Sequence, residues 1–189
     1  LLTCELPETG KKNCLVATKD VMSQKAKTKS VSIGISLLKN PSRFEWFLEK
    51  ATEIGVAEII PLVCDRTEKE KFRWERFQNI CISAMLQSRQ YWLPKLYEPK
   101  IFHDAVMNTN AVTKLIAHCE DTNKNELKDF VNMEANESNI TIILIGPEGD
   151  FTSEEINHAI TNNFVPVSMG ITRLRTETAG VVAAAMLVS

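Results

Sequence analysis

The sequence predicts an α/β protein built around a parallel sheet. From Val31 onward, short apolar runs alternate with helix-like segments, and two of these runs end in glycine-bearing loops, residues 145–150 and 168–179. This alternation is typical of a parallel sheet that is covered by helices on both faces. Both loops then lie at the carboxyl ends of buried strands, which is where open α/β sheets bind their ligands.

Before Val31 the pattern is different. Residues 2–6 and 14–18 alternate between apolar and polar side chains, which predicts two strands. A strand pair of this size is not stable alone. Residues 31–36 predict the first strand of the α/β region.

A helix should follow that strand. Ser42 and Glu45 have the spacing of a capping box, in which the serine accepts a hydrogen bond from the first turn and the glutamate reaches back. We expect this helix to run to about Ile54 and to end at Gly55, a residue suited to the left-handed conformation. The next expected elements are a strand at 57–63, a helix at 74–88 and a strand at 112–118.

The two glycine loops belong to the last part of the chain. Residues 140–145 and 164–168 predict the strands that precede them, and Thr152 with Glu155 forms a second capping box, flanked by Phe151 and Ile156 as a hydrophobic staple. The final helix, residues 178–188, is apolar on every side, so it must be buried all round, in a core or against another subunit. Its many small residues favour a partner subunit.

The two loops, in this order, resemble those of one known family. Gly146 to Asp150 is similar to the G-P-E-G-G pattern, and Met169 to Ala179 to the L-G-x-x-x-L-R-x-E-T-A pattern, of the RsmE-type SPOUT methyltransferases. Upstream, residues 47–56 with Arg66, then 84–88 and Pro94, are also similar. The resemblance extends over roughly residues 30 to 189.

The resemblance implies a methyltransferase that uses S-adenosylmethionine (SAM) and methylates N3 of a decoding-region uridine in 16S ribosomal RNA of the small subunit. It implies a SPOUT fold over residues 30–189, with a C-terminal trefoil knot and a homodimer built on that region. Residues 1–29 would be the remnant of an N-terminal PUA-like β-barrel. Two alternatives stay open: a non-catalytic RNA-binding or ribosome-assembly protein with the same fold, and a SPOUT methyltransferase that acts on another RNA base.

The expected SAM site joins segments that the sequence places at strand ends. Glycine lets a loop backbone approach a ligand closely, and the exposed peptide groups can hydrogen-bond a flat heterocycle. The residues that we expect around SAM are Ala117, His118, Ile145, Gly146, Glu148, Gly149, Ser168, Met169, Gly170, Leu174, Arg175, Thr176, Thr178 and Ala179. Glu148 could attract the sulfonium or simply pin its turn, and a lone histidine such as His118 is more often a packed residue.

Arg175 and Glu177 are the candidate catalytic residues. A guanidinium at Arg175 could hold an RNA phosphate or the uracil carbonyls and so stabilise the N3 anion, and a salt bridge with Glu177 or Glu148 is the competing role. Glu177 lies just ahead of the last helix, where the helix dipole favours a negative charge, so a structural role is equally open, with Thr178 as an alternative N-cap. No residue stands out as the general base for the N3 proton.

The resemblance assigns Lys50, Arg66, Gln87 and Arg89 to the RNA side. For Lys50, an ion pair with Glu53 is the competing role. The chain departs from the family where Gln87-Ser88-Arg89-Gln90 replaces the usual Q-S-G-R, and where Asp150 stands in place of glycine.

The net charge of −2 means that any RNA contact must come from local patches. A first run of lysines, Lys25, Lys27 and Lys29, is more typical of a solvated face. A second run contains Arg66, Lys69, Lys71, Arg73 and Arg76 and is interleaved with Phe72, Trp74 and Phe77. RNA contact and a solvated face are equally open for this second run.

The five cysteines form no C-x-x-C pair, which indicates reduced cytosolic thiols and neither a disulfide framework nor a metal site. We therefore expect a cytoplasmic protein without a metal. No apolar run approaches the ~18 residues that span a bilayer, and no signal peptide opens the sequence, so no membrane association is expected.

Overall fold

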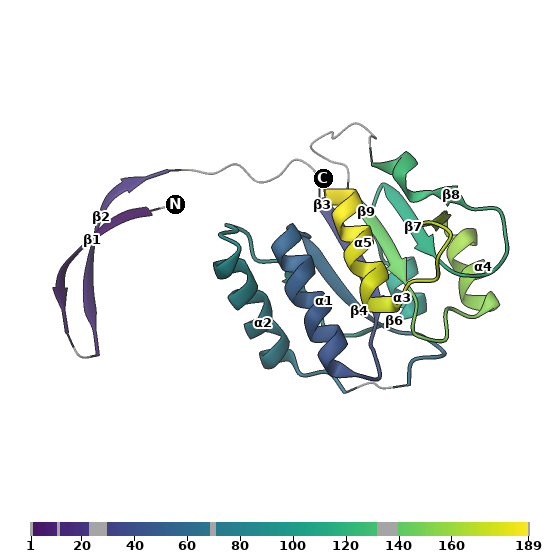
Figure 1. The fold of residues 1–189 in the computed structure, drawn as a ribbon, viewed down its shortest axis with the longest axis horizontal. Helices are drawn as coiled ribbons and strands as arrows, with labels where there is room; N and C mark the ends of the chain where they lie inside the picture. The colour runs from purple at the N-terminus through teal and green to yellow at the C-terminus, as the bar shows by residue number, and fades with distance from the viewer. Residues whose placement is uncertain (1, 11, 23–29, 69–70, 132–139, 189) are drawn as a thin grey trace.

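The computed structural model describes residues 2–10, 12–22, 30–68, 71–131 and 140–188 of the 189-residue chain. The main sheet has eight strands in the order β5-β4-β3-β9-β7-β10-β8, in which β6 also pairs with β4 (Figure 1). Every described pair in this sheet is parallel, so the predicted parallel α/β architecture is confirmed. The strands are β3 (Ser30–Ser36), β4 (Glu58–Val63), β5 (Lys95–Leu96), β6 (Lys100–Ile101), β7 (Thr113–Ala117), β8 (Asn125–Glu126), β9 (Ile140–Ile145) and β10 (Val165–Ser168).

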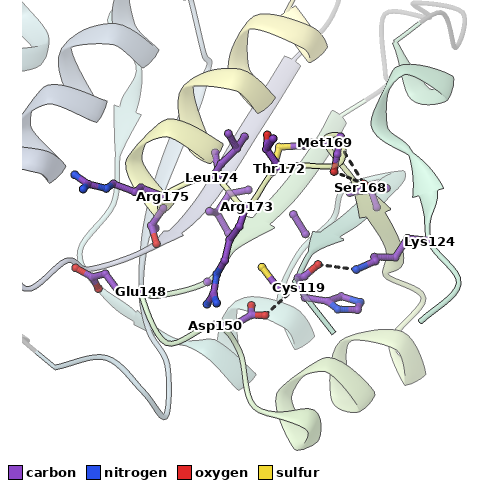
Figure 2. A pocket seen from close by; sticks show the side chains of 18 of the residues that line it. Cys119, Lys124, Glu148, Asp150, Ser168, Met169, Thr172, Arg173, Leu174 and Arg175 are labelled. Atoms are coloured by element: carbon purple, nitrogen blue, oxygen red, sulfur yellow. Dashed lines mark hydrogen bonds between the residues drawn. The ribbon is translucent and has the colours of Figure 1, made fainter. Parts of the chain in front are cut away.

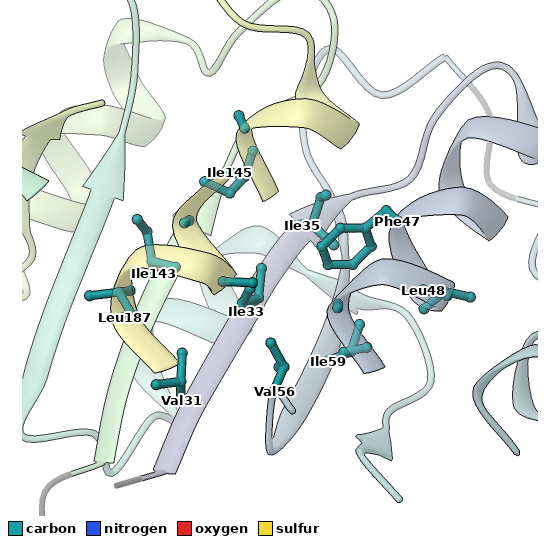
Figure 3. Packing of buried hydrophobic residues seen from close by; sticks show 14 of the residues in the cluster. Val31, Ile33, Ile35, Phe47, Leu48, Val56, Ile59, Ile143, Ile145 and Leu187 are labelled. Carbon is teal, nitrogen blue, oxygen red and sulfur yellow. The ribbon is translucent and has the colours of Figure 1, made fainter. Parts of the chain in front are cut away.

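Helices cover both faces of the sheet. They are α1 (Pro41–Ile54), α2 (Trp74–Gln87), α3 (Phe102–Met107), α4 (Ser153–Thr161) and α5 (Thr176–Val188), with a 3-10 turn at Leu127–Phe130. Side chains alternate along the central strands. Ile143 and Ile145 pack in a cluster with α1, α2 and α5 (Figure 3). Ile142 and Leu144 pack in a second cluster, with α3 and α4. Burial on both faces explains why β9 is apolar at nearly every position.

Helix α1 begins differently from the prediction. Asn40 is the N-cap, and its side chain accepts a hydrogen bond from the Ser42 N–H at 3.0 Å, with Pro41 in the first turn. The predicted capping box of Ser42 and Glu45 is therefore wrong, because an asparagine followed by proline already supplies a cap two residues earlier. The expected C-terminus is confirmed, since Gly55 follows Ile54 in the left-handed conformation with φ 96°.

Helix α4 has the predicted capping box. The Thr152 hydroxyl accepts from the Glu155 N–H at 3.2 Å, and the Glu155 carboxylate accepts from the Thr152 N–H at 2.9 Å. Glu155 is fully buried and also accepts from the Asp65 N–H at 3.0 Å, so it joins the end of β4 to the start of α4. The flanking Phe151 and Ile156 are both buried in the cluster beneath α3 and α4.

Helix α5 is buried on one side within this chain. Its buried residues include Ala179, Gly180, Ala183, Ala184 and Leu187, whereas Ala185 is exposed. Gly180 faces the ring of Phe47 on α1 and the Ile35 side chain on β3, so the small residues allow close packing inside the chain. Burial on all sides is not found within the described chain.

The predicted N-terminal strands form a separate two-stranded antiparallel sheet, β1 (Leu2–Thr9) and β2 (Cys14–Val21). Figure 1 shows it apart from the main sheet. Lys25, Lys27, Lys29 and Lys69 lie outside the described residues. The short elements β5, β6, β8 and α3 were not predicted.

Candidate functional site

A cavity of about 450 Å³ lies at the carboxyl ends of β7, β9 and β10, with the start of α5 as a further wall (Figure 2). This volume is within the usual range for small-molecule sites. The lining residues come from three segments and α5: Ala117, His118, Cys119 and Lys124; Ile145, Gly146, Pro147, Glu148 and Asp150; Val167, Ser168, Met169, Gly170, Ile171, Thr172, Arg173, Leu174 and Arg175; and Thr176 with Ala179. Both predicted glycine loops therefore face the same space.

Glycine is required for a different reason in each loop. A Cβ at Gly146 would lie 3.1 Å from the backbone N and from the ring of Phe151, so the loop has no room for a side chain there. Gly170 has open space around it but a φ of 121°, which L-residues rarely adopt. The first loop is closed by a hydrogen bond from the Asp150 N–H to the Pro147 carbonyl at 2.9 Å.

The structure brings most of the predicted cofactor residues together. All of them line the cavity except Gly149 and Thr178. The Gly149 carbonyl instead accepts a hydrogen bond from Arg66, and Thr178 lies inside the first turn of α5, which begins at Thr176, so Thr178 is not its N-cap. Cys119 and Lys124 were missed because they follow β7 without any motif.

Asp150 joins two of the lining segments. Its Oδ2 accepts from the Cys119 N–H at 2.7 Å, and its Oδ1 accepts from the Phe151 N–H at 2.9 Å. The residue has a φ of 65°, a conformation that Asp tolerates better than most residues. Burial raises the pKa of the neighbouring Cys119 thiol, and the Asp150 charge adds to this shift. Asp150 thus fixes the β7 loop against the Gly146 loop, a role that glycine could not perform.

His118 lines the cavity with both ring nitrogens unpaired. Its exposed fraction is 7%, and neither Nδ1 nor Nε2 has a hydrogen-bond partner among the described residues. Burial lowers the pKa of this imidazole and the Lys124 charge lowers it further, while Asp150 and Glu120 oppose the shift. The ring is therefore neutral near pH 7, with one donor and one acceptor. Buried polar atoms without partners call for an explanation, and a bound ligand is one.

The charged residues Arg175, Glu148 and Glu177 differ in whether another group of the protein binds them. Arg175 is exposed and lines the cavity, and no ion pair is formed by it among the described residues. Glu148 accepts a hydrogen bond from the Lys39 N–H at 3.3 Å. Glu177 does not line the cavity: it is buried, its Oε1 lies 3.7 Å from Arg43 Nε, and its Oε2 has no described partner. The competing salt bridges of Arg175 are thus absent from the described structure.

Comparison with known proteins identifies the family. Residues 25–188 match the family described as RNA methyltransferase domain. The chain belongs to this family. A curated relative named Ribosomal RNA small subunit methyltransferase E, from Synechocystis sp., is 32% identical over 159 residues, which cover 83% of this chain and 52% of the relative. The chain therefore spans about half the length of that relative.

Solved structures of RNA methyltransferases have the same fold. A probable rRNA-methyltransferase from Porphyromonas gingivalis is 34% identical, with a TM-score of 0.88 over 97% of this chain and 77% of that one. A Ribosomal RNA small subunit methyltransferase E from Neisseria gonorrhoeae, bound to S-adenosyl methionine, is 26% identical, with a TM-score of 0.82 over 97% of this chain and 76% of that one.

In this RNA methyltransferase domain, only two of the four residues predicted to contact RNA lie together. Lys50 and Gln87 line an open hollow of about 880 Å³ between α1 and α2, where Lys50 Nζ lies 2.6 Å from Glu49 and 3.0 Å from Glu53. Arg66 donates to the Gly149 carbonyl at 2.7 Å and so braces the first glycine loop. Arg89 is exposed beyond the end of α2.

The aromatic residues of the second basic run pack together. The Phe77 ring is buried and lies 5.0 Å from Phe72 and 5.3 Å from Phe44, between ring centroids. Arg76 forms an ion pair with Glu45, with Nη2 2.8 Å from Oε2. The aromatic residues in this run therefore reflect the packing of α1 against α2. Of Phe72, Trp74 and Phe77, only Trp74 is exposed.

Two further findings concern other classes of site. Among the described residues, no group of three or more His, Cys, Asp or Glu side chains is placed to hold a metal ion. No described helix has both the length and the apolar character that a bilayer crossing requires.

Proposed function

We propose that this chain is the catalytic domain of a SAM-dependent enzyme that methylates N3 of a decoding-region uridine in 16S ribosomal RNA. The observation that carries the proposal is the cavity at the strand ends, where both glycine loops meet. Its support is family membership, together with relatives that are named for the small-subunit ribosomal RNA or crystallised with SAM. Because the chain spans only part of those relatives, activity and substrate are proposed for it and not transferred.

The cavity residues fit SAM. Ile145, Val167, Leu174 and Ala179 offer apolar walls for the adenine, and the loop peptide groups offer hydrogen bonds at its rim. The unpaired nitrogens of His118 provide one donor and one acceptor for polar atoms of the ligand. When bound, SAM supplies a methyl group that its sulfonium has already activated. The main tasks of the protein are then positioning and electrostatics.

Arg175 is the residue that we place against the uridine. Its guanidinium is exposed at the cavity and unpaired among the described residues, so it is available to hold the uracil carbonyls and stabilise the N3 anion. Glu177 faces Arg43 from the first turn of α5, and we assign it a positioning role for that turn. The geometry nominates no general base.

We also propose the finer features of the family for this chain. These are a trefoil knot through residues 168–176, a PUA-like origin for β1 and β2, the homodimer and a cytoplasmic location with the small ribosomal subunit as partner. The partly exposed apolar side of α5, which includes Val182 and Ala185, supports a partner subunit at this helix. A subunit interface there would complete the burial that the sequence predicts.

The test is nucleoside mass spectrometry of small subunits incubated with the protein and labelled SAM. We expect 3-methyluridine from the wild type. With Arg175→Ala we expect at least a ~100-fold slower turnover, because a charge that stabilises the reacting anion is lost, but near-normal affinity for S-adenosylhomocysteine in calorimetry. RNA binding without methyl transfer would favour the non-catalytic alternative, and another methylated nucleoside would favour a different base. Retained turnover would demote Arg175.

A further inference from the structure

Three of the cations that the sequence analysis considered for RNA are bound by other groups of the protein. Lys50 contacts two carboxylates, Arg66 donates to main-chain carbonyls, and Arg76 is paired with Glu45. An RNA substrate needs cations that remain available to phosphates, because these contacts provide most of the affinity. Arg89 is exposed and remains available, and further cations lie near it in the sequence.

Residues 89–100, which we call the edge strip, combine positive charge with exposed rings. The strip contains Arg89, Lys95 and Lys100 against a single acidic residue, Glu98, in a chain whose net charge is −2. Tyr91 and Trp92 have exposed fractions of 54% and 51%, which is unusual for such large rings. Neither these rings nor the Arg89 guanidinium has a described partner.

The lysines of the strip also keep their charge available. Lys95 Nζ and Lys100 Nζ lie 4.4 Å and 4.7 Å from the centroid of the Tyr97 ring, one from each of the short strands β5 and β6. Neither forms an ion pair with a described carboxylate. A cation held over a ring is positioned without being neutralised.

The backbone of the strip is held in place. The Gln90 N–H donates to the Met85 carbonyl at 3.0 Å and its side chain donates to the Glu53 carbonyl at 3.1 Å. Farther along, the Lys95 N–H donates to the Ala57 carbonyl at 2.9 Å. A fixed backbone presents the rings with less loss of conformational entropy when a ligand binds.

The strip runs the length of the sheet edge. Lys95 pairs with Glu58 at the amino end of β4, and Lys100 pairs with Leu62 near its carboxyl end. The cavity opens at the carboxyl end of the same parallel sheet. A strand of nucleic acid that follows the strip therefore leads toward the end of the molecule where the cavity lies.

We propose that the edge strip binds an unpaired, single-stranded stretch of the RNA substrate. Bases stack on Tyr91 and Trp92, while Arg89, Lys95 and Lys100 contact phosphates. Stacking needs bases whose faces are free, so a single strand is favoured over a duplex. The inference rests on the proposed action on RNA, but it concerns a surface separate from the SAM cavity.

The test uses the full chain and a fluorescein-labelled oligouridine decamer in anisotropy titrations. Tyr91→Ala/Trp92→Ala should weaken binding at least tenfold, since each stacked base is worth roughly 5- to 150-fold. Lys95→Gln and Lys100→Gln should each lower the salt slope of log K by roughly 0.7. Trp46→Ala is the matched control, because Trp46 is 42% exposed but lies on α1, outside the strip, and it should leave affinity unchanged.

A second measurement reports on stacking directly. The chain has three tryptophans, so Trp46→Phe/Trp74→Phe leaves Trp92 as the sole indole, and its fluorescence should be quenched by the decamer. Unchanged affinity of the double alanine variant for the decamer would overturn the proposal. So would an equal loss of affinity for an RNA duplex, because paired bases cannot stack on the two rings. Dependence on the lysines alone would overturn it too. Failure of the proposed function would appear separately, as absent S-adenosylhomocysteine binding and methyl transfer.

Discussion

Replacing Gly180 by alanine sets two opposing effects against each other. Alanine is favoured over glycine inside a helix by about 1 kcal/mol. The new Cβ, however, would lie 2.7 Å and 2.8 Å from ring atoms of Phe47 and 2.9 Å from Cδ1 of Ile35. Phe47 and Ile35 are fully buried, so they have little freedom to move aside. Overpacking of a dense core costs about 1–3 kcal/mol, and three such contacts place this site at the upper end. We expect a net loss of about 1–2 kcal/mol in unfolding free energy.

Urea unfolding followed by circular dichroism measures this loss. Phe47→Leu should relieve the clash, so the double variant should be at least 1 kcal/mol more stable than the sum of the single effects predicts. Because Thr176 and Ala179 line the cavity from the same helix, Gly180→Ala should also weaken S-adenosylhomocysteine binding in calorimetry. A variant as stable as the wild type would refute the close approach of α5 to α1 and β3.

Four other substitutions test three separate features. Glu155→Ala removes the acceptor for the Asp65 and Thr152 N–H groups at a fully buried site, so thermal unfolding should show a loss of about 3 kcal/mol, and a loss below about 1 kcal/mol would contradict the bridging role. Burial lowers the pKa of His118, so below its ordinary value of 6.5 the unfolded chain binds the proton and the folded chain does not. The free energy of unfolding of the wild type should therefore fall as pH drops from about 6.5 toward the folded pKa. In His118→Phe, the urea midpoint should not show this fall. Parallel pH profiles of the two proteins would argue against a buried, neutral His118. Gly146→Val should abolish S-adenosylhomocysteine binding because its side chain meets Phe151, whereas Gly170→Ala, with open space but a φ of 121°, should weaken it only about tenfold. Calorimetry separates the two, and unchanged binding in both would refute the cavity assignment.

The sequence predicted the sheet well because its strands are buried on both faces. Apolar runs such as Ile140–Ile145 are visible without any knowledge of their neighbours, and the chemistry of Gly55 and Thr152 is local. The two glycine loops were found for the same reason, since each directly follows such a strand. Strands β5 and β6 have two residues each, too few to show a period.

What the sequence left open is which partner each charged or aromatic side chain takes. Whether Lys50 contacts RNA or the carboxylates of its own helix depends on side-chain rotamers. The hydrogen bond from Arg66 to the Gly149 carbonyl joins residues that are 83 positions apart in the sequence. The second basic run was ambiguous because a ring that stacks on a base and a ring that packs in a core have the same composition. Only the fold shows that Phe77 is buried and Trp92 is not.

The two glycine loops also matter for drug design. Their residues line the cavity, and a peptide N–H is lost by mutation only when proline replaces the residue. An inhibitor that takes its hydrogen bonds from the main chain of residues 146–150 and 168–172 would therefore be little affected by most side-chain substitutions. Compounds that rely on Ile171, whose side chain is fully exposed, would be easier to escape.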